Sequence, residues 1–441
     1  MSQPIKNQFL ALAGQVLPAA VGMISFMLLV RVLDQQVLGE YLIYMTTVVL
    51  FEMVKSGGLQ SALIMRVSEN DAEKRDIVVG SAYWFGALVV ISSAVLLLAG
   101  YFLSVFRQGS GFHVFCLAYA VMGFITLPLH IAEAEAVAAQ KLQFLLVLRL
   151  LQSLNPLLVA VLAWMGMDTL YGLVTVHVGF NALLLAFVLL TARTNPLLVF
   201  KRSKEEVMRL FHLVKYTLAT LGTTNVLKSA DTFLIGAIMG PAAVALYAIP
   251  LKLTELFEIP LRTLSTTAFP QLANRFNSND KPGFRKGFLS YLTGSYLLYI
   301  PGLMLAFALA PFLVQLIGGK QYADTAGIFR VFVLFGFFLP LNRITGIVLD
   351  AMQKPGLNFI KVAIMALVNI LADLAAIYLA ESLNWVAFAS VINAVTGCFL
   401  GVYFIKKSGL VLDSNVWNDI KQIIKVTASR PLNRLGYTCT K

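Results

Sequence analysis

The sequence predicts an all-α polytopic membrane protein with twelve transmembrane helices in two six-helix lobes. Three observations lead to this expectation: the composition, the spacing of the apolar stretches, and the distribution of Lys and Arg. Of the 441 residues, 59% are hydrophobic and 13% are charged, and the mean hydropathy is +0.80. An average soluble domain contains about 25% charged residues. The composition therefore excludes a protein built mainly from soluble domains.

The apolar stretches set the number of expected helices, because a helix needs about 20 mainly apolar residues to cross a bilayer. Twelve such stretches are centred near residues 20, 50, 91, 125, 157, 181, 228, 254, 300, 337, 369 and 394. If the N-terminus lies inside, 23 of the 34 Lys and Arg residues fall in cytoplasmic segments and three fall outside. Cytoplasmic loops are enriched in these residues, so we expect both termini in the cytoplasm. The same bias explains the net charge of +12 without a nucleic-acid partner.

Short motifs recur in the two halves of the chain at a nearly constant separation. Leu50-Phe-Glu52 is followed 206 residues later by Leu256-Phe-Glu258, and Leu127-Pro-Leu129 is followed 212 residues later by Leu339-Pro-Leu341. Their common order suggests two copies of a six-helix unit. An even number of spans gives both copies the same orientation, so an axis along the membrane normal would relate them.

The repeat and the loops divide the chain into an N-terminal six-helix lobe (1–195), a cytoplasmic amphipathic linker (196–215), a C-terminal six-helix lobe (216–405) and a cytoplasmic tail (406–441). In the linker, Ser203 and Glu206 have the spacing of a helix capping box. The tail is expected to contain a second amphipathic helix, whose basic side would favour anionic membrane lipids.

Charged residues inside the expected spans are the candidate functional residues. A charged side chain at mid-bilayer costs about 2.5–3.5 kcal/mol, so such residues face a polar interior or pair with each other. Four of them are spaced three or four apart in the eighth expected span, along one side of a helix where they can pair: Lys252, Glu255, Glu258 and Arg262.

Two further pairs have a spacing of three residues, Glu52 with Lys55 in the second expected span and Lys228 with Asp231 in the seventh. Each pair is either a neutral contact that ties helices together, or a functional pair. In the functional case the cation binds an anionic group, and the acid titrates or binds a coupling cation. Arg343, deep in the tenth expected span, suits phosphate because a guanidinium can donate two parallel hydrogen bonds.

Other polar residues support weaker hypotheses. His130 and Glu133 share a helix face, which is compatible with a proton relay or with hydrogen-bonded packing. Lys361 lies near a span end, where we expect its side chain to snorkel to the interface. The sequence contains no arrangement typical of nucleophilic catalysis, no metal-ligand spacing and no glycine-rich phosphate loop. We therefore expect a protein that is not an enzyme and that needs no cofactor or metal.

Several local features resemble one known family. They are a turn that contains Arg31, Gly39 and Tyr41, the segment 57–63 followed by Arg66, and the doubled six-helix plan in a chain of 441 residues. Together they resemble bacterial polysaccharide lipid-carrier flippases of the O-antigen type. These flippases belong to the multidrug, oligosaccharidyl-lipid and polysaccharide exporter superfamily. We expect the residues of the turn to be structural.

The resemblance implies a substrate and a mechanism. The protein would flip an oligosaccharide linked by diphosphate to a polyprenol, from the cytoplasmic to the periplasmic leaflet of the bacterial inner membrane. It would work by alternating access, for the biosynthesis of lipopolysaccharide O-antigen, capsule or exopolysaccharide. Membrane lipids and other polysaccharide-assembly proteins are the expected partners.

The resemblance also implies a cationic cavity for the diphosphate head group. From depth and helix face, the candidate cations are Lys55, Lys228, Lys252, Arg262 and Arg343. The acids that could couple transport to H+ or Na+ are Glu52, Asp231, Glu255 and Glu258.

Two other functions stay open. A multidrug or cation antiporter of the same superfamily would need the acids without the basic residues, and the five deep cations argue against it. A membrane-embedded glycan polymerase or ligase would need a catalytic constellation and a large outside loop. The sequence shows neither feature.

Overall fold

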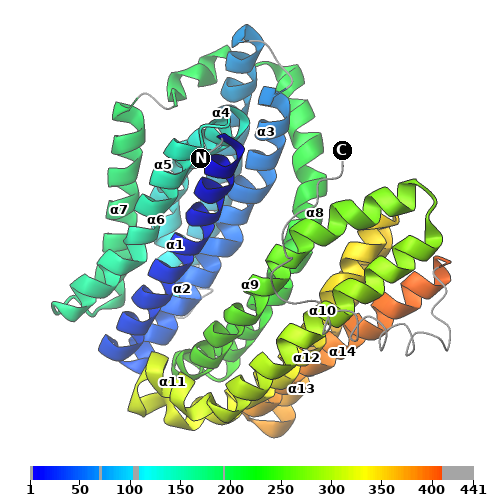
Figure 1. Cartoon of the computed structure of the whole chain (residues 1–441). Helices are drawn as coiled ribbons and strands as arrows, with labels where there is room; N and C mark the ends of the chain where they lie inside the picture. Colours follow the sequence, from blue (N-terminus) through cyan, green and yellow to red (C-terminus); the bar gives the residue numbers. More distant parts are fainter. Residues whose placement is uncertain (1–2, 69–71, 103–108, 192–193, 410–441) are drawn as a thin grey trace. The chain divides into compact units, whose positions relative to one another are not determined.

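The protein is helical throughout the part of the chain that the structure describes. The structure is a computed structural model that describes residues 3–68, 72–102, 109–191 and 194–409, and these residues contain helices and no strand (Figure 1). They form two compact units. The first extends to Leu246 and includes Ile317–Gly319, and the second comprises Tyr247–Leu316 and the chain from Lys320 onward.

The first unit contains seven long helices and three shorter segments in its described residues. They are α1 (Gln3–Val32), α2 (Gln35–Met53), the π-helix η1 (Val54–Leu59), α3 (Gln60–Ser68), α4 (Ala72–Phe102), α5 (Gly111–Ala138), α6 (Leu142–Trp164), α7 (Leu170–Leu190), the 3-10 helix η2 (Pro196–Lys201) and α8 (Lys204–Ile238). α5 is the central helix, because α2, α3, α4 and α7 all pack against it, while α1 lies along α6. α8 packs against α2, η1 and α4.

The second unit begins within α9 (Pro241–Asn277). It continues with α10 (Lys281–Ala308), α11 (Ala310–Gly318), the 3-10 helix η3 (Lys320–Thr325), α12 (Ala326–Ala351), α13 (Pro355–Ala380) and α14 (Leu383–Lys407). Here α12 packs against α10, α13 and α14. Its apolar core joins α9, α10, α12 and α14 around Phe284, Phe288 and Val348.

Nine helical segments of the described chain are long and apolar enough to cross a membrane. They are Gln35–Val67, Lys74–Phe102, Gly111–Ala138, Leu142–Trp164, Leu170–Leu190, Lys281–Ala308, Lys320–Ala351, Pro355–Ala380 and Leu383–Lys407. They coincide with nine of the twelve expected spans and identify a multi-pass membrane protein. The expected spans at α1, α8 and α9 stay predictions, as does the arrangement of twelve spans in two lobes.

The segment expected to be a separate linker helix is part of two helices in the structure, η2 and the beginning of α8. From Lys204 onward it is the first part of α8, which packs with the first unit, and Leu210 is fully buried against α3 and α4. The expected capping box is wrong, because the side chain of Ser203 makes no capping hydrogen bond. Glu206 instead accepts a hydrogen bond from Arg66 at 2.8 Å. The expected tail helix lies outside the described residues.

Gly39 allows α2 to approach closely the first residues of α9, which belong to the first unit. We expected it in a turn, but α2 already begins at Gln35 after the N-cap Asp34, so Gly39 lies inside that helix. A Cβ atom at Gly39 would lie 1.8 Å from the carbonyl oxygen of Pro241, at the start of α9. The prediction of a turn was therefore wrong. The missing side chain of Gly39 lets the α2 backbone lie against the backbone of Pro241.

Replacing Gly39 by Ala is expected to destabilise the protein by about 1–3 kcal/mol, the usual cost of overpacking. The neighbouring atoms are backbone and cannot move aside as a side chain would. The matched control is Gly22→Ala, because a Cβ at Gly22 in α1 meets nothing within 4 Å. Thermal unfolding in detergent would measure both variants, and equal midpoints for the two would contradict the close approach.

Candidate functional site

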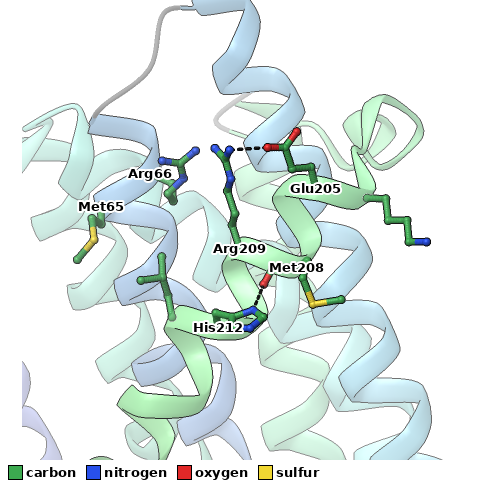
Figure 2. Close-up of a pocket in the computed structure, with 8 residues that line it drawn as sticks. Met65, Arg66, Glu205, Met208, Arg209 and His212 are labelled. Atoms are coloured by element: carbon green, nitrogen blue, oxygen red, sulfur yellow. Dashed lines mark hydrogen bonds and ion pairs between the residues drawn. The ribbon is translucent and has the colours of Figure 1, made fainter.

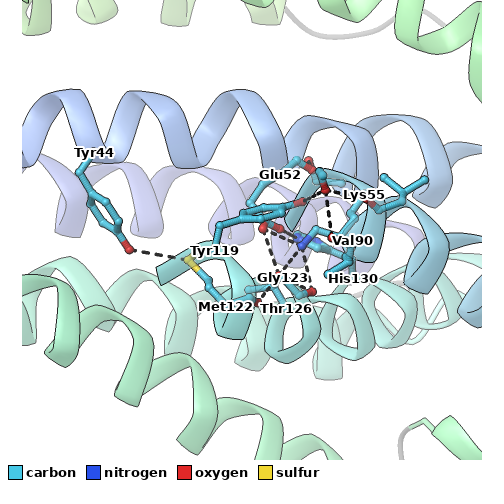
Figure 3. Close-up of polar contacts among 12 residues, drawn as sticks. Tyr44, Glu52, Lys55, Val90, Tyr119, Met122, Gly123, Thr126 and His130 are labelled. Carbon is cyan, nitrogen blue, oxygen red and sulfur yellow. Dashed lines mark hydrogen bonds and ion pairs between the residues drawn. The ribbon is translucent and has the colours of Figure 1, made fainter. Parts of the chain in front are cut away.

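A buried polar cluster lies where α2 and η1 pack against α5, and it contains Glu52 and Lys55 (Figure 3). Glu52 lies near the end of α2, and Lys55 lies in η1, a single stretch of π-helix. Such π-segments are often found at functional sites, because the extra residue in the turn redirects the side chains around it.

The Lys55 ammonium is surrounded by three oxygen atoms. Its Nζ atom lies 2.7 Å from Glu52 Oε1, 2.7 Å from Thr126 Oγ1 and 3.1 Å from the carbonyl oxygen of Gly123. The ring of Tyr119 lies 5.5 Å from Nζ. Only 1% of the Lys55 side chain is exposed. All three ammonium hydrogens therefore have an acceptor in this conformation.

The Glu52 carboxylate also binds His130. Nε2 of His130 lies 2.9 Å from Glu52 Oε2, and Thr126 Oγ1 lies 3.1 Å from Glu52 Oε1. Of the two roles left open for His130, the hydrogen bond to Glu52 fits hydrogen-bonded packing, and Glu133 accepts a hydrogen bond from Arg149 at 3.1 Å. The histidine thus belongs to the Glu52 cluster, and Figure 3 shows it beside Thr126 and Glu52.

A second polar chain continues from α5 toward α2 and α7. The hydroxyl of Tyr44 lies 2.9 Å from Nδ1 of His177 and 3.7 Å from the sulfur of Met122. Asn155 of α6 donates to the carbonyl of His177 at 3.2 Å. The interior of the first unit therefore contains hydrogen-bonded groups from four helices.

α8 carries the other expected pair of the first unit. Asp231 is buried, with 6% of its surface exposed, whereas Lys228 is exposed. The two residues differ in how far the protein covers them, although they are only three positions apart.

The four expected charges of α9 form two separate ion pairs within the helix. Lys252 Nζ lies 2.8 Å from Glu255 Oε2, and Arg262 Nη2 lies 2.9 Å from Glu258 Oε2. This confirms that the spacing lets them pair along the helix. Glu255 and Arg262 are largely exposed, at 59% and 66% of their side chains, whereas Lys252 is 27% exposed.

Arg343 of α12 points toward α9. Its Nε atom donates to Ser265 Oγ at 3.0 Å, and the arginine itself is exposed. Ser265 lies one turn after Arg262 on α9, so the structure brings both arginines to the same pair of helices in the second unit. Of the five candidate cations, these two and Lys228 are exposed, Lys252 is partly covered and Lys55 is buried.

Two polar features of the second unit are buried inside it. Lys361 does not snorkel, because it is 2% exposed and donates to the carbonyl of Asn342 at 3.0 Å. Asn369 and Asp373 are buried together, with 2.7 Å between the amide nitrogen and a carboxylate oxygen. Their spacing of four residues places Asn369 and Asp373 on the same face of α13, where they can make this contact.

A surface groove between α3 and α8 was also not expected. It has a volume of about 920 Å³ and is lined by Met65, Arg66, Lys204, Glu205, Met208, Arg209, His212 and Leu213 (Figure 2). Its two arginines already bind acids, since Arg66 pairs with Glu206, and Arg209 pairs with Glu205 and Glu206. The groove therefore offers less positive charge than its basic residues suggest.

Comparison with known proteins identifies the family. The sequence profile of a family described as "Polysaccharide biosynthesis protein" matches residues 28–327. The chain belongs to this family. Comparison with curated proteins gives no match.

The fold is that of transporters of the MOP superfamily. An inward-facing multidrug resistance MATE transporter aligns with a TM-score of 0.72 at 13% identity, covering 91% of this chain and 100% of the other. The lipid II flippase MurJ, in an inward closed conformation, aligns with a TM-score of 0.70 at 14% identity, covering 95% and 92%. A MOP superfamily transporter from Pyrococcus furiosus aligns with a TM-score of 0.56 at 14% identity, covering 91% and 94%.

Breaking the buried pair of Glu52 and Lys55 should strongly destabilise this member of the polysaccharide biosynthesis family. Either Lys55→Met or Glu52→Gln leaves one charge buried without its partner, which destabilises proteins by about 3–5 kcal/mol. The double variant is neutral at both positions. It should lose clearly less free energy of unfolding than the sum of the losses in the two single variants. Thermal unfolding of the three variants measures this coupling.

The matched control is the exposed pair of Lys201 with Asp76, which has the same separation of 2.7 Å. Lys201→Met and Asp76→Asn should each change stability by less than about 1 kcal/mol, as is usual for surface pairs. If the stability losses of Glu52→Gln and Lys55→Met simply add in the double variant, as expected for the surface pair, the buried contact contributes no coupling energy.

Proposed function

We propose that the protein is a flippase for polyprenyl-diphosphate-linked oligosaccharide. It moves this lipid from the cytoplasmic to the periplasmic leaflet of the bacterial inner membrane, for cell-surface polysaccharide biosynthesis. The family assignment supports a role in polysaccharide biosynthesis. The fold, which is shared with a lipid II flippase, supports a lipid-linked substrate. Both termini are proposed to lie in the cytoplasm, and other polysaccharide-assembly proteins are proposed partners.

The observation that carries the proposal is the exposure of Arg262 and Arg343 in long helices of the second unit. A charge that faced lipid near mid-bilayer would cost about 2.5–3.5 kcal/mol. We therefore assign these side chains to a water-filled pathway. A diphosphate carries several anionic oxygens, and arginine binds such groups with two hydrogen bonds at once.

The paired acids support a role in energy coupling. Glu255 and Glu258 neutralise Lys252 and Arg262 when no substrate is bound. A bound diphosphate would replace Glu258 as the partner of Arg262, and the released carboxylate would then bind H+ or another cation. The membrane potential is a second source of energy, since a charge that crosses the whole field gains about 2.3 kcal/mol per 100 mV. Alternating access would expose these groups to each side in turn.

A cation antiporter is the second candidate function. The similarity to a MATE transporter supports it, as does the presence of an acid beside both Lys252 and Arg262. The two functions differ in which residues are essential. A flippase for an anionic lipid depends on the arginines, whereas a cation antiporter depends on the acids.

The test is leaflet-resolved translocation of a fluorescent polyprenyl-diphosphate oligosaccharide in proteoliposomes. A lost hydrogen bond to a charged group costs about 1.5–3 kcal/mol, so Arg262→Ala and Arg343→Ala should each slow transport about ten- to hundredfold. The matched control is Arg330→Ala, which removes the same charge from the first turns of α12, where Arg330 lies over the ring of Phe307.

The outcomes separate the proposals. Slow transport by both folded arginine variants, with normal transport by Arg330→Ala, would support the diphosphate site. Normal transport by all three would remove the arginines from the site but leave the flippase function. Wild-type protein that exchanges organic cations for H+ and moves no lipid would favour the antiporter, and glycan chain growth in the vesicles would favour a polymerase.

A further inference from the structure

The oxygen atoms around the Lys55 ammonium form the kind of cage that binds a small cation. They comprise a carboxylate oxygen of Glu52, the hydroxyl of Thr126 and the backbone carbonyl of Gly123, at 2.7, 2.7 and 3.1 Å from Nζ. Carboxylate, hydroxyl and carbonyl oxygens are the ligands that hard cations prefer. In this chain a side-chain ammonium occupies their centre.

The cage is held by the surrounding helices as well as by the lysine. Gly123 lies where α4 packs closely on α5, since a Cβ atom there would be 2.7 Å from Val90. The hydroxyl of Thr126 is also within 3.0 Å of the carbonyl of Met122, in the preceding turn of α5. The oxygen atoms on α5 would therefore stay in place if the lysine were shortened.

The charges of the cluster require one cation. Glu52 supplies one negative charge, and His130 binds its second oxygen. An ionised carboxylate only accepts hydrogen bonds, so Nε2 of His130 carries the proton that it donates. Nδ1 of His130 is buried and has no hydrogen-bond partner among the described residues. The Lys55 ammonium, 2.7 Å from the other carboxylate oxygen, is the cation that contacts Glu52 directly.

We infer that the first unit contains a monovalent-cation site whose permanent occupant is the protein's own Lys55 ammonium. Glu52 then binds no Na+ while Lys55 is in place, and shortening the lysine opens the site to NH4+ or Na+. This goes beyond the proposed flippase function, because it removes Na+ binding at Glu52 from the possible coupling steps. It holds whichever molecule the protein transports.

The test is thermal unfolding of the full chain in detergent, with NaCl, NH4Cl or choline chloride at equal ionic strength. Lys55→Ala and Lys55→Met both remove the ammonium, and Met also fills the space of the lysine stem. We expect a saturable rise of several degrees in the midpoint of these variants with NH4Cl or NaCl, but not with choline chloride, because a cation that binds only the folded state stabilises it.

Three controls make the test specific. Wild type should show no cation-specific rise that depends on Glu52, because its site is filled. Lys55→Ala combined with Glu52→Gln should show none either, because the cage then has no charge to balance. Lys201→Ala, which removes a surface lysine from its pair with Asp76, should behave like wild type.

Two results would overturn the inference: a Na+-specific rise in the wild-type midpoint that Glu52→Gln removes, or the absence of any cation-specific rise in both Lys55→Ala and Lys55→Met. Recovery of folded Lys55→Ala only when NH4Cl or NaCl is present during purification would support it. Failure to recover either variant in all three salts would count against it, because an open cage should accept a free cation. The readout is unfolding, so it does not depend on the transport assay.

Discussion

The pairing of Glu52 with Lys55 is the interaction on which the interior of the first unit depends. Lys55 is covered on all sides, and its ammonium hydrogens reach oxygen atoms on both α2 and α5. A buried charge without its partner is unstable in an apolar interior. The polar residues of α5, Thr126 and His130, are therefore required by the pair that they contact, and α2 and η1 can pack on α5 only in the register that brings them together.

In the second unit, the charged residues of α9 also need partners, but they find them on the same helix. The pairs on α9 form between residues three or four apart on one helix, so they need no second helix to complete them. Exposed pairs of this kind contribute only about 0.3–0.5 kcal/mol. Under the proposed flippase function, an arginine in such a pair would exchange its carboxylate for a substrate phosphate at little cost in stability. The buried pair of the first unit cannot make this exchange without opening the packing around it.

Sequence reasoning predicted what depends on local order along the chain. The helices and nine of the spans were predicted because hydropathy is averaged over about 20 residues, and the pairs of α9 were predicted because helical spacing determines them. Contacts between helices were not predicted. His130 binds Glu52 rather than Glu133, and Lys361 is buried by its neighbours. Such contacts depend on how each helix is rotated and how closely it packs, which a single sequence does not specify.

The repeated Leu-Phe-Glu motif shows how one local pattern can serve two purposes. Glu52 is followed after three residues by Lys55 in a π-helical turn, which directs the lysine into the bundle. Glu258 is followed after four residues by Arg262 on the α-helix α9, where both side chains are partly or largely exposed. The first pair has the burial expected of a fixed structural element, and the second has the exposure that a ligand contact requires. If the proposed flippase function holds, the residues that contact its anionic substrate are therefore expected on α9 and α12, while the Glu52 cluster preserves the packing of the first unit.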